Sequence, residues 1–257
     1  MNLFDLTGKI AVVTGASSGL GADAARAYAA QGADVALLAR RKEKLDAVVA
    51  EIAATGRKAF AVPCDVSNED SVKAAVEQVL AHYGRIDILL NDAGIAQGGS
   101  VETLTIDDWD RSMNINVKGI YLMSKYIVPG MKERKYGRIV NIASVNAIVA
   151  DKGDALVRHV YNASKSAVLG LTKGMAATYA RYNITVNALG PGLFESEMTA
   201  GTLFKHQEFM NMYNMRCPAS RPGARGEMNG PILFFSSDAC SYVNGQFFVV
   251  DGGFTSV

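Results

Sequence analysis

The chain alternates short runs of apolar, often β-branched residues with longer amphipathic stretches, and this alternation constrains the fold more than any other feature. Apolar runs predict strands at residues 9–14, 34–39, 59–63, 86–91, 137–144, 184–189 and 246–251. The stretches between them predict helices at residues 19–31, 42–54, 71–83, 106–134 (interrupted early) and 161–182. Strands that are apolar throughout belong to a sheet covered on both faces. We therefore predict a single α/β domain over residues 1–257, with a doubly wound, Rossmann-type parallel sheet of about seven strands and helices on both faces.

One segment departs from the alternation. Residues 190–238 show no strand pattern and are rich in Met, Phe and Gly, so we expect a lid over a substrate site. The net charge of +1 provides no basic field for nucleic acid. No apolar run approaches the ~18 residues that span a bilayer, and the first residues lack the basic region of a signal peptide. We expect a cytoplasmic protein that binds neither nucleic acid nor membrane.

Cysteine and histidine positions give no sign of a metal site. The odd number of cysteines, with no CxxC pair, predicts buried free thiols, and the histidines are scattered. The residues concerned are Cys64, Cys217, Cys240, His82, His159 and His206.

A glycine-rich turn follows the first predicted strand. Residues 14–21 read TGASSGLG and place Gly15, Gly19 and Gly21 between that strand and a helix. Backbone N–H groups at a helix N-terminus bind the pyrophosphate of a dinucleotide, and side chains in place of the glycines would push it away. The spacing is not the generic GxGxxG, so the turn alone fits a tight connection equally well.

The end of the second predicted strand indicates which dinucleotide would bind. NAD-binding proteins place a carboxylate there to hold the ribose hydroxyls, but this strand ends in Arg40 and Arg41. Asp34 lies about five residues too early to reach the ribose, since each strand residue rises ~3.3 Å. A guanidinium fork matches the oxygens of a 2′-phosphate. We therefore favour NADP over NAD; the alternative is that both arginines mark a solvated helix start.

Tyr161 and Lys165 are four residues apart and lie on one face of a predicted helix. An ammonium near a phenol favours the phenolate, which makes such a tyrosine a proton-transfer group near neutral pH. Three further polar residues could serve a site. Two of them, Asn91 and Ser144, end predicted strands, and Asn116 lies within a predicted helix. The carboxyl ends of strands line the ligand crevice of such a sheet. Taken singly, each residue also fits a structural role.

Together and in this order, the motifs resemble the short-chain dehydrogenase/reductase family. The resemblance covers essentially the whole chain: TGASSGLG, CDV, NDAG, NINVKG, IAS, YNASK, NALGPG and VNGQFFVVDGG. It implies a catalytic tetrad of Asn116, Ser144, Tyr161 and Lys165. In that tetrad Tyr161 exchanges a proton with the substrate oxygen, Lys165 holds the nicotinamide ribose and Ser144 orients the substrate. Asn116 holds a water that links Lys165 to solvent.

The same resemblance implies the cofactor site and the assembly. Asp65 and Val66 contact adenine, and residues 191–196 border the nicotinamide. The implied cofactor residues are Gly15, Ser17, Ser18, Gly19, Leu20, Gly21, Arg40, Arg41, Asp65, Val66, Asn91, Ala93, Gly94, Tyr161, Lys165, Pro191, Gly192, Leu193 and Ser196. The family usually forms homotetramers, with dimers as the alternative.

Three features depart from the family pattern. Asp92 stands where the family usually has Asn, and Ala143 stands where it usually has Ser. Ser144 and Tyr161 are 17 residues apart, several more than is common. The extra, charged loop at residues 151–159 is expected at the substrate mouth, where it recognises a polar substrate or forms a mere solvated excursion.

The segments GPGLFESEMT and VNGQFFVVDGG look most like polyol and sugar-acid dehydrogenases of the gluconate 5-dehydrogenase type. This implies a small alcohol or ketone substrate. Hydroxysteroid dehydrogenases and 3-oxoacyl reductases share the tetrad, and the Met- and Phe-rich residues 203–215 suit an apolar ligand equally well. For a carrier-protein substrate, Arg216, Arg221 and Arg225 form a loose basic cluster. A non-catalytic nucleotide sensor on the same fold is the alternative from another class.

Overall fold

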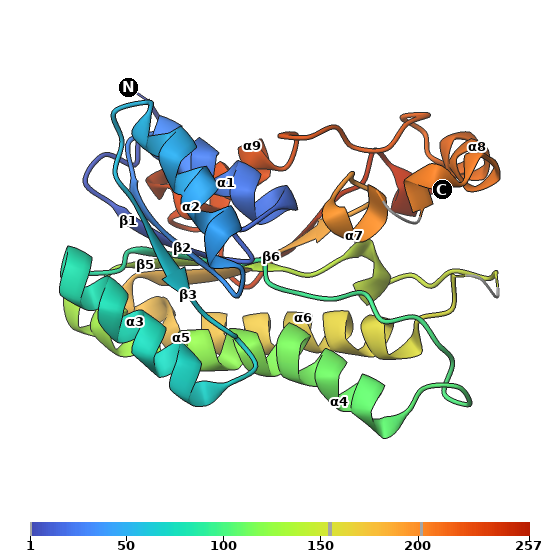
Figure 1. Ribbon diagram of the computed structural model, residues 1–257, viewed down its shortest axis with the longest axis horizontal. Helices are drawn as coiled ribbons and strands as arrows, with labels where there is room; N and C mark the ends of the chain where they lie inside the picture. Colours follow the sequence, from blue (N-terminus) through green and yellow to red (C-terminus); the bar gives the residue numbers. More distant parts are fainter. Residues whose placement is uncertain (1, 154–155, 201–202) are drawn as a thin grey trace.

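The computed structural model describes residues 2–153, 156–200 and 203–257. Over these residues, seven parallel strands form one sheet in the order β3-β2-β1-β4-β5-β6-β7 (Figure 1). The strands are β1 (Ile10–Thr14), β2 (Asp34–Ala39), β3 (Ala59–Pro63), β4 (Ile88–Asn91), β5 (Gly137–Ile142), β6 (Ile184–Pro191) and β7 (Phe247–Val250). The predicted doubly wound parallel sheet is confirmed.

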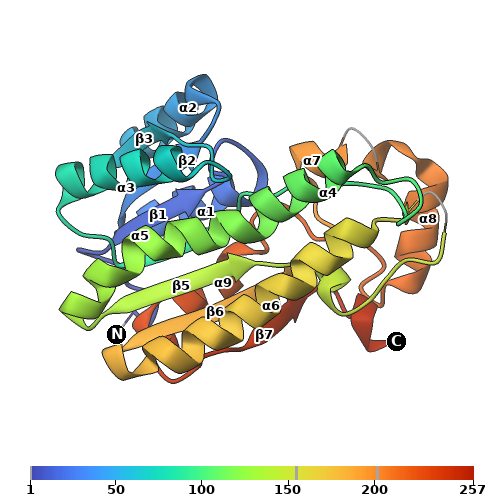
Figure 2. The same cartoon turned by 90° about the horizontal axis from the view of Figure 1, so that it is seen from below.

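Helices cover both faces of the sheet (Figures 1 and 2). One layer holds α1 (Gly19–Ala30), α2 (Lys42–Ala53) and α9 (Asn229–Ser236); the other holds α3 (Glu69–Tyr83), α5 (Gly119–Arg134) and α6 (His159–Tyr179). α4 (Ile106–Met113) runs into α5 through the π-helical segment η1 (Asn114–Lys118), which is the early interruption predicted for this helix. α7 (Glu197–Ala200) and α8 (Gln207–Arg216) lie beyond the carboxyl ends of the strands. Short 3-10 turns are η2 (Val145–Ala147), η4 (Ala180–Tyr182), η5 (Leu203–Lys205), η6 (Asp238–Cys240) and η7 (Phe254–Ser256).

The alternating direction of side chains along the strands explains why the sheet is covered on both faces. Ala11 and Val13 of β1 belong to the apolar cluster that packs against α1 and α9. Val12, between them, belongs to the cluster under α3 and α5. Every residue of β1 is buried. A strand with alternating polar and apolar residues would place polar side chains in the core here, so the strand must be apolar throughout. Within the described residues, no helix combines the length and the apolarity needed to cross a membrane.

Two boundaries differ from the prediction in ways that concern the site. β5 ends at Ile142 rather than at residue 144, so Ser144 begins the turn beyond the strand. α9 falls within the predicted lid, residues 190–238, but its Ile232 and Phe235 are buried in the core cluster of α1. The lid expectation therefore applies only to the part of the segment before α9. Residues 201–202 of that part lie outside the described residues.

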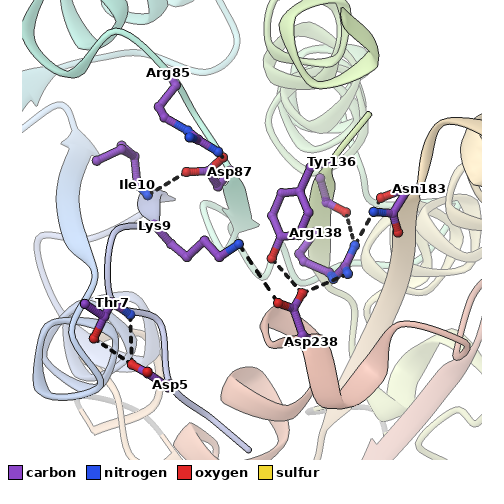
Figure 3. A network of polar contacts seen from close by, with 11 residues as sticks. Asp5, Thr7, Lys9, Ile10, Arg85, Asp87, Tyr136, Arg138, Asn183 and Asp238 are labelled. Carbon is purple, nitrogen blue, oxygen red and sulfur yellow. Dashed lines mark hydrogen bonds and ion pairs between the residues drawn. The ribbon is translucent and has the colours of Figure 1, made fainter. Parts of the chain in front are cut away.

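A polar network closes the amino end of the sheet, away from the strand ends where ligands bind (Figure 3). The guanidinium of Arg138, on β5, is buried and donates to the carboxylate of Asp238 at 3.0 Å and to the Asn183 carbonyl at 3.1 Å. The Tyr136 hydroxyl donates to the same carboxylate at 2.9 Å, and Lys9 Nζ lies 3.7 Å from the centre of the Tyr136 ring. Because Asp238 follows α9, the network fixes the end of that helix to the sheet.

Candidate active site

The strand order places β1 between β2 and β4, and the crevice at such a switch in strand order is where open α/β sheets bind ligands. A cavity of about 370 Å³, here called the first cavity, opens there. It brings together these residues expected from the sequence: Gly15, Ser17, Ser18, Gly19, Leu20, Arg40, Arg41, Asp65, Val66, Ala93, Gly94, Ser144, Tyr161, Lys165, Pro191, Gly192 and Ser196.

Four expected residues lie outside the walls of the first cavity. Asn91 is buried, and its amide donates to Asn141 Oδ1 at 2.9 Å, so its side chain points into the sheet. Gly21 lies behind the glycine turn, and Leu193 lines a neighbouring cavity instead. Asn116 is fully buried. The amide nitrogen of Asn91 is thus committed to a bond inside the sheet, and a place for Asn91 in the cofactor groove stays a prediction.

The glycines of the turn allow a left-handed backbone and a close approach to the loop after β4. Gly15 has a φ of +70°, and a Cβ there would lie 2.9 Å from the backbone nitrogen of Ala93. Gly19, at a φ of +55°, begins α1. Ser18 stands at the N-cap, but among the described residues its side chain makes no capping bond. The start of α1 therefore has no side-chain cap that would compete with an anion.

Tyr161 and Lys165 both lie on α6, one helical turn apart. Lys165 Nζ lies 5.7 Å from the centre of the Tyr161 ring and donates to the Ile142 carbonyl at 2.8 Å. The side chain of Lys165 is buried, with only 5% of the residue exposed. The β5 carbonyl thus holds a positive charge beside the phenol ring.

Asn116 occupies the π-helical segment η1, a distortion that is frequent at functional sites. Its Oδ1 accepts from the Ile95 N–H at 2.9 Å, and its Nδ2 donates to the Ile95 carbonyl at 3.0 Å. The same Nδ2 donates to Ser164 Oγ at 2.9 Å, and that hydroxyl donates to the Tyr161 carbonyl at 2.8 Å. Asn116 therefore ties the loop after β4 to the turn of α6 that carries Tyr161.

Ser144 is the N-cap of η2, and its Oγ accepts from the Asn146 N–H at 3.1 Å. The amide of Asn162, on α6, donates to the carbonyls of Asn146 and Val149 at 3.0 and 2.9 Å. These bonds fasten the segment after Ser144 to the helix that carries Tyr161. Ser144 and Tyr161 both line the first cavity, so their spacing of 17 residues in the sequence does not separate them in space.

A second cavity of about 320 Å³ adjoins the first and shares Ser144, Tyr161, Gly192 and Thr199 with it. The loop before α6 contributes Asp151, Leu156, Val157 and Arg158 to its wall, and the expectation that this loop lies at the substrate mouth stays a prediction. Residues 154–155 of the loop lie outside the described residues. The other walls include Asn146, Leu193, Leu203, Phe209, Met212, Tyr213, Arg216 and Phe254.

Comparison with known proteins gives a consistent result over the whole chain. Residues 9–206 match the short chain dehydrogenase family. The chain is 41% identical over 254 residues to gluconate 5-dehydrogenase of Gluconobacter oxydans, covering 99% of this chain and 97% of that enzyme. It is 38% identical over 248 residues to a 3-oxoacyl-(acyl-carrier-protein) reductase of Thermotoga maritima, covering 96% and 98% of the two chains.

Among solved structures, a gluconate 5-dehydrogenase from Burkholderia cenocepacia J2315, in complex with NADP and tartrate, gives a TM-score of 0.94. It is 36% identical, and the match covers 100% of this chain and 98% of that one. This chain belongs to the short-chain dehydrogenase family. It is an oxidoreductase, and the resemblance drawn from its motifs is confirmed.

This short-chain dehydrogenase carries a titratable group against its glycine turn. A Cβ at Gly21 would come within 2.7 Å of Asp92 Oδ2, and the Gly21 N–H donates to that carboxylate. Burial raises the pKa of Asp92 to about 7, although the charge of Lys165 and the Gly21 N–H act in the opposite direction. Asp92 therefore changes charge near neutral pH at a position where the usual asparagine is always neutral.

Sequence reasoning missed Glu197, the first residue of α7. Arg41 Nη2 donates to Glu197 Oε2 at 2.7 Å and to Ser17 and Ser18 Oγ at 3.0 and 3.2 Å. Lys44 also pairs with Glu197, and its hydrogen bond, followed by that of Arg41, lowers the pKa of Glu197 to about 2. These contacts link the predicted lid of this dehydrogenase to the end of β2. No local pattern could have indicated them, since Glu197 and Arg41 are 156 residues apart.

Phe254 was missed as well. Its ring stacks on Tyr213 with 5.2 Å between ring centres, which brings the carboxyl-terminal turn to the wall of the second cavity. In the sequence, a phenylalanine after two glycines does not indicate a residue of a binding cavity.

Proposed function

We propose that this enzyme transfers a hydride between NADP(H) and the carbinol or ketone carbon of a polyol or sugar acid, with Asn116, Ser144, Tyr161 and Lys165 as its tetrad. One observation carries the proposal: the first and second cavities meet at Ser144 and Tyr161. A dinucleotide along the first cavity and a small substrate in the second would come into contact there. Such contact is the geometric requirement for direct transfer between two bound molecules.

The first cavity fits a dinucleotide phosphorylated at the 2′ position. The uncapped start of α1, beside the glycine turn, suits a pyrophosphate, and Arg40 and Arg41 suit the 2′-phosphate. The Burkholderia relative, which holds NADP, supports the same cofactor here. When bound, NADP(H) supplies or accepts the hydride at the nicotinamide.

Tyr161 is the proton-transfer residue of this proposal. Its hydroxyl gives a proton to the substrate oxygen during reduction and takes one during oxidation. Lys165, buried and held by the Ile142 carbonyl, supplies the positive charge that stabilises the phenolate left behind. Ser144 lines both cavities, and its hydroxyl orients the substrate oxygen. Asn116 acts through Ser164 and Ile95 by fixing the backbone around Tyr161.

Tyr161→Phe tests this assignment. We expect kcat to fall by roughly 10²–10⁴-fold, because the group that moves the proton is removed. NADPH fluorescence titration should show an unchanged dissociation constant. Tyr179→Phe is the matched control, because it removes a hydroxyl from the same helix outside both cavities and should leave kcat unchanged. Turnover retained by Tyr161→Phe would contradict the proposal.

A 3-oxoacyl or hydroxysteroid reductase is the second candidate. Phe209, Met212 and Phe254 give the second cavity apolar walls, and the Thermotoga relative is a 3-oxoacyl reductase. Assays with gluconate, a 3-oxoacyl thioester and a hydroxysteroid, each with NADP(H), separate these substrate classes. NADPH binding without turnover of any of them would favour a nucleotide sensor.

The proposal extends to assembly and location. We expect a homotetramer, with a dimer as the alternative, because Ile106, Trp109 and Tyr121 on α4 and α5 expose 75%, 39% and 50% of their surfaces. The edge strand β7 exposes 54% of Phe248. Size-exclusion chromatography with light scattering measures the assembly. The three cysteines are buried free thiols, which fits the reducing cytoplasm, and cell fractionation tests this location.

A further inference from the structure

Two arginines line the second cavity, and they come from segments far apart in the sequence. Arg158 stands at the N-cap of α6, and Arg216 is the last residue of α8. α8 and the start of α6 lie at the same end of the molecule in both views (Figures 1 and 2). The proposed tetrad leaves both residues without a role.

Arg158 is held by its own backbone rather than by an acidic partner. It forms a bridge with Gly99, and the neighbouring His159 N–H donates to the Gly99 carbonyl at 3.0 Å. Its Nε donates to the Leu156 carbonyl at 3.2 Å. Among the described residues, its two terminal nitrogens make neither a hydrogen bond nor an ion pair. Arg158 is thus positioned with the fork of its guanidinium still unused.

Arg216 is supported by an aromatic platform. Its guanidinium lies 5.2 Å from the centre of the Phe254 ring, which in turn stacks on Tyr213. The Asp251 carboxylate accepts from the Thr255 N–H at 2.7 Å and so shapes the turn that carries Phe254. Within the described part of the chain, no carboxylate pairs with Arg216. Stacking fixes a guanidinium plane without using its hydrogen-bond donors.

Several other arginines of this chain, although not all, meet a carboxylate of the protein: Arg26 with Glu51, Arg41 with Glu197, Arg85 with Asp87, Arg138 with Asp238, Arg221 with Glu227 and Arg225 with Asp23. Asp151 is the acidic residue in the wall of the second cavity, and it forms no ion pair with either cavity arginine in the described structure. Two cations without a carboxylate partner, beside the proposed reaction centre, offer an anion from outside the protein a place to bind. A carboxylate is the anion that a guanidinium fork binds with two parallel bonds.

We propose that Arg158 and Arg216 form a carboxylate subsite, which binds the acid group of the substrate while Ser144 and Tyr161 engage its reacting oxygen. This inference rests on the proposed function and extends it: the two arginines make the enzyme select a hydroxy or keto acid over a neutral polyol. Arg158 comes from the loop that lengthens the spacing between Ser144 and Tyr161. The extra loop therefore has a specific use in acid recognition.

The test compares D-gluconate with D-gluconamide, which keeps the hydroxyl chain and removes only the charge. The wild-type enzyme should favour gluconate in kcat/KM by about 10- to 100-fold, since a charge-assisted pair is lost with the amide. Arg158→Gln and Arg216→Gln should each raise KM for gluconate about 10-fold with little change in kcat, the pattern of lost uniform binding. Gluconamide kinetics should change by less than about 2-fold.

Two controls secure the interpretation. Arg181→Gln removes a charge beyond the far end of α6 and should leave both substrates unaffected. Unchanged melting temperature and unchanged NADPH affinity in the two cavity variants show that they fold. Equal effects on gluconate and gluconamide, or a wild-type enzyme indifferent to the charge, would overturn the subsite.

A binding assay separates this inference from the proposed function. Calorimetric titration of the NADPH-loaded protein with D-gluconate measures recognition without turnover. If no carbinol is oxidised but gluconate binding still depends on Arg158 and Arg216, the subsite stands and the catalytic proposal fails. If carbinols are oxidised but gluconate binding is the same in the wild type and both variants, the subsite fails and the function stands.

Discussion

Glu197→Gln should tighten the binding of NADPH. The carboxylate of Glu197 pairs with Arg41 at 2.7 Å and also with Lys44. Arg41 is one of the residues proposed to hold the 2′-phosphate, so a phosphate that reaches Arg41 competes with the carboxylate already there. Glutamine keeps the size of the side chain and removes the negative charge that competes with and repels the phosphate.

The exposure of the partners sets the magnitude of this effect. The side chains of Arg41 and Glu197 are 47% and 46% exposed, so their ion pair is worth ~0.2–1 kcal/mol. The pair between Lys44 and Glu197 is similarly exposed and adds a comparable amount. If both pairs must be given up, the variant should bind NADPH roughly 2- to 30-fold more tightly, at RT of about 0.59 kcal/mol.

Fluorescence titration with NADPH and NADH at low and high salt measures this prediction. NADH lacks the 2′-phosphate, so its affinity should change much less, and high salt should reduce the difference for NADPH. Glu195→Gln is the control, because it removes a charge from the same segment without touching the pair with Arg41. Unchanged or weaker NADPH binding in Glu197→Gln would refute the competition, and equal tightening of NADH would show that the phosphate is not involved.

Three further predictions concern single residues. Arg40→Ala should weaken NADPH binding far more than NADH binding, and equal losses would place recognition of the 2′-phosphate elsewhere. Asp92→Asn should gain stability relative to the wild type as pH rises from about 4 to about 8: burial raises the pKa of Asp92 from 3.8 to about 7, so ionisation in that window costs the folded state. Parallel profiles of melting temperature against pH would contradict this reasoning. Asp238→Ala leaves the buried guanidinium of Arg138 without its acidic partner and should lower the free energy of unfolding by about 1–3 kcal/mol in urea denaturation. A loss below about 0.5 kcal/mol would mean that solvent replaces the carboxylate at no cost.

Much of the fold and part of the site followed from local patterns in the sequence. The wholly apolar strands predicted a sheet covered on both faces, because each residue of a strand such as β1 must be buried. The glycines predicted a tight turn between β1 and α1, and at Gly15 a side chain would collide with the backbone of Ala93. The spacing of Tyr161 and Lys165 predicted one helix face, because residues four apart are neighbours on a helix. Each of these inferences concerns residues close together in the chain, where backbone geometry sets the distances.

The tertiary structure decided what depends on packing between distant segments. Asn91 stands at a strand end as expected, but bonding to Asn141 on the adjacent strand turns its side chain inward. The composition of residues 190–238 predicted a lid, yet α9, at residues 229–236 of that segment, packs into the core. Arg41 meets Glu197, and Arg216 meets Phe254, only because the chain returns to the same strand ends after long excursions. The sequence alone determined which residues could bind a dinucleotide and move a proton; the packing of the lid, the loop before α6 and the carboxyl terminus decided which charges surround the substrate.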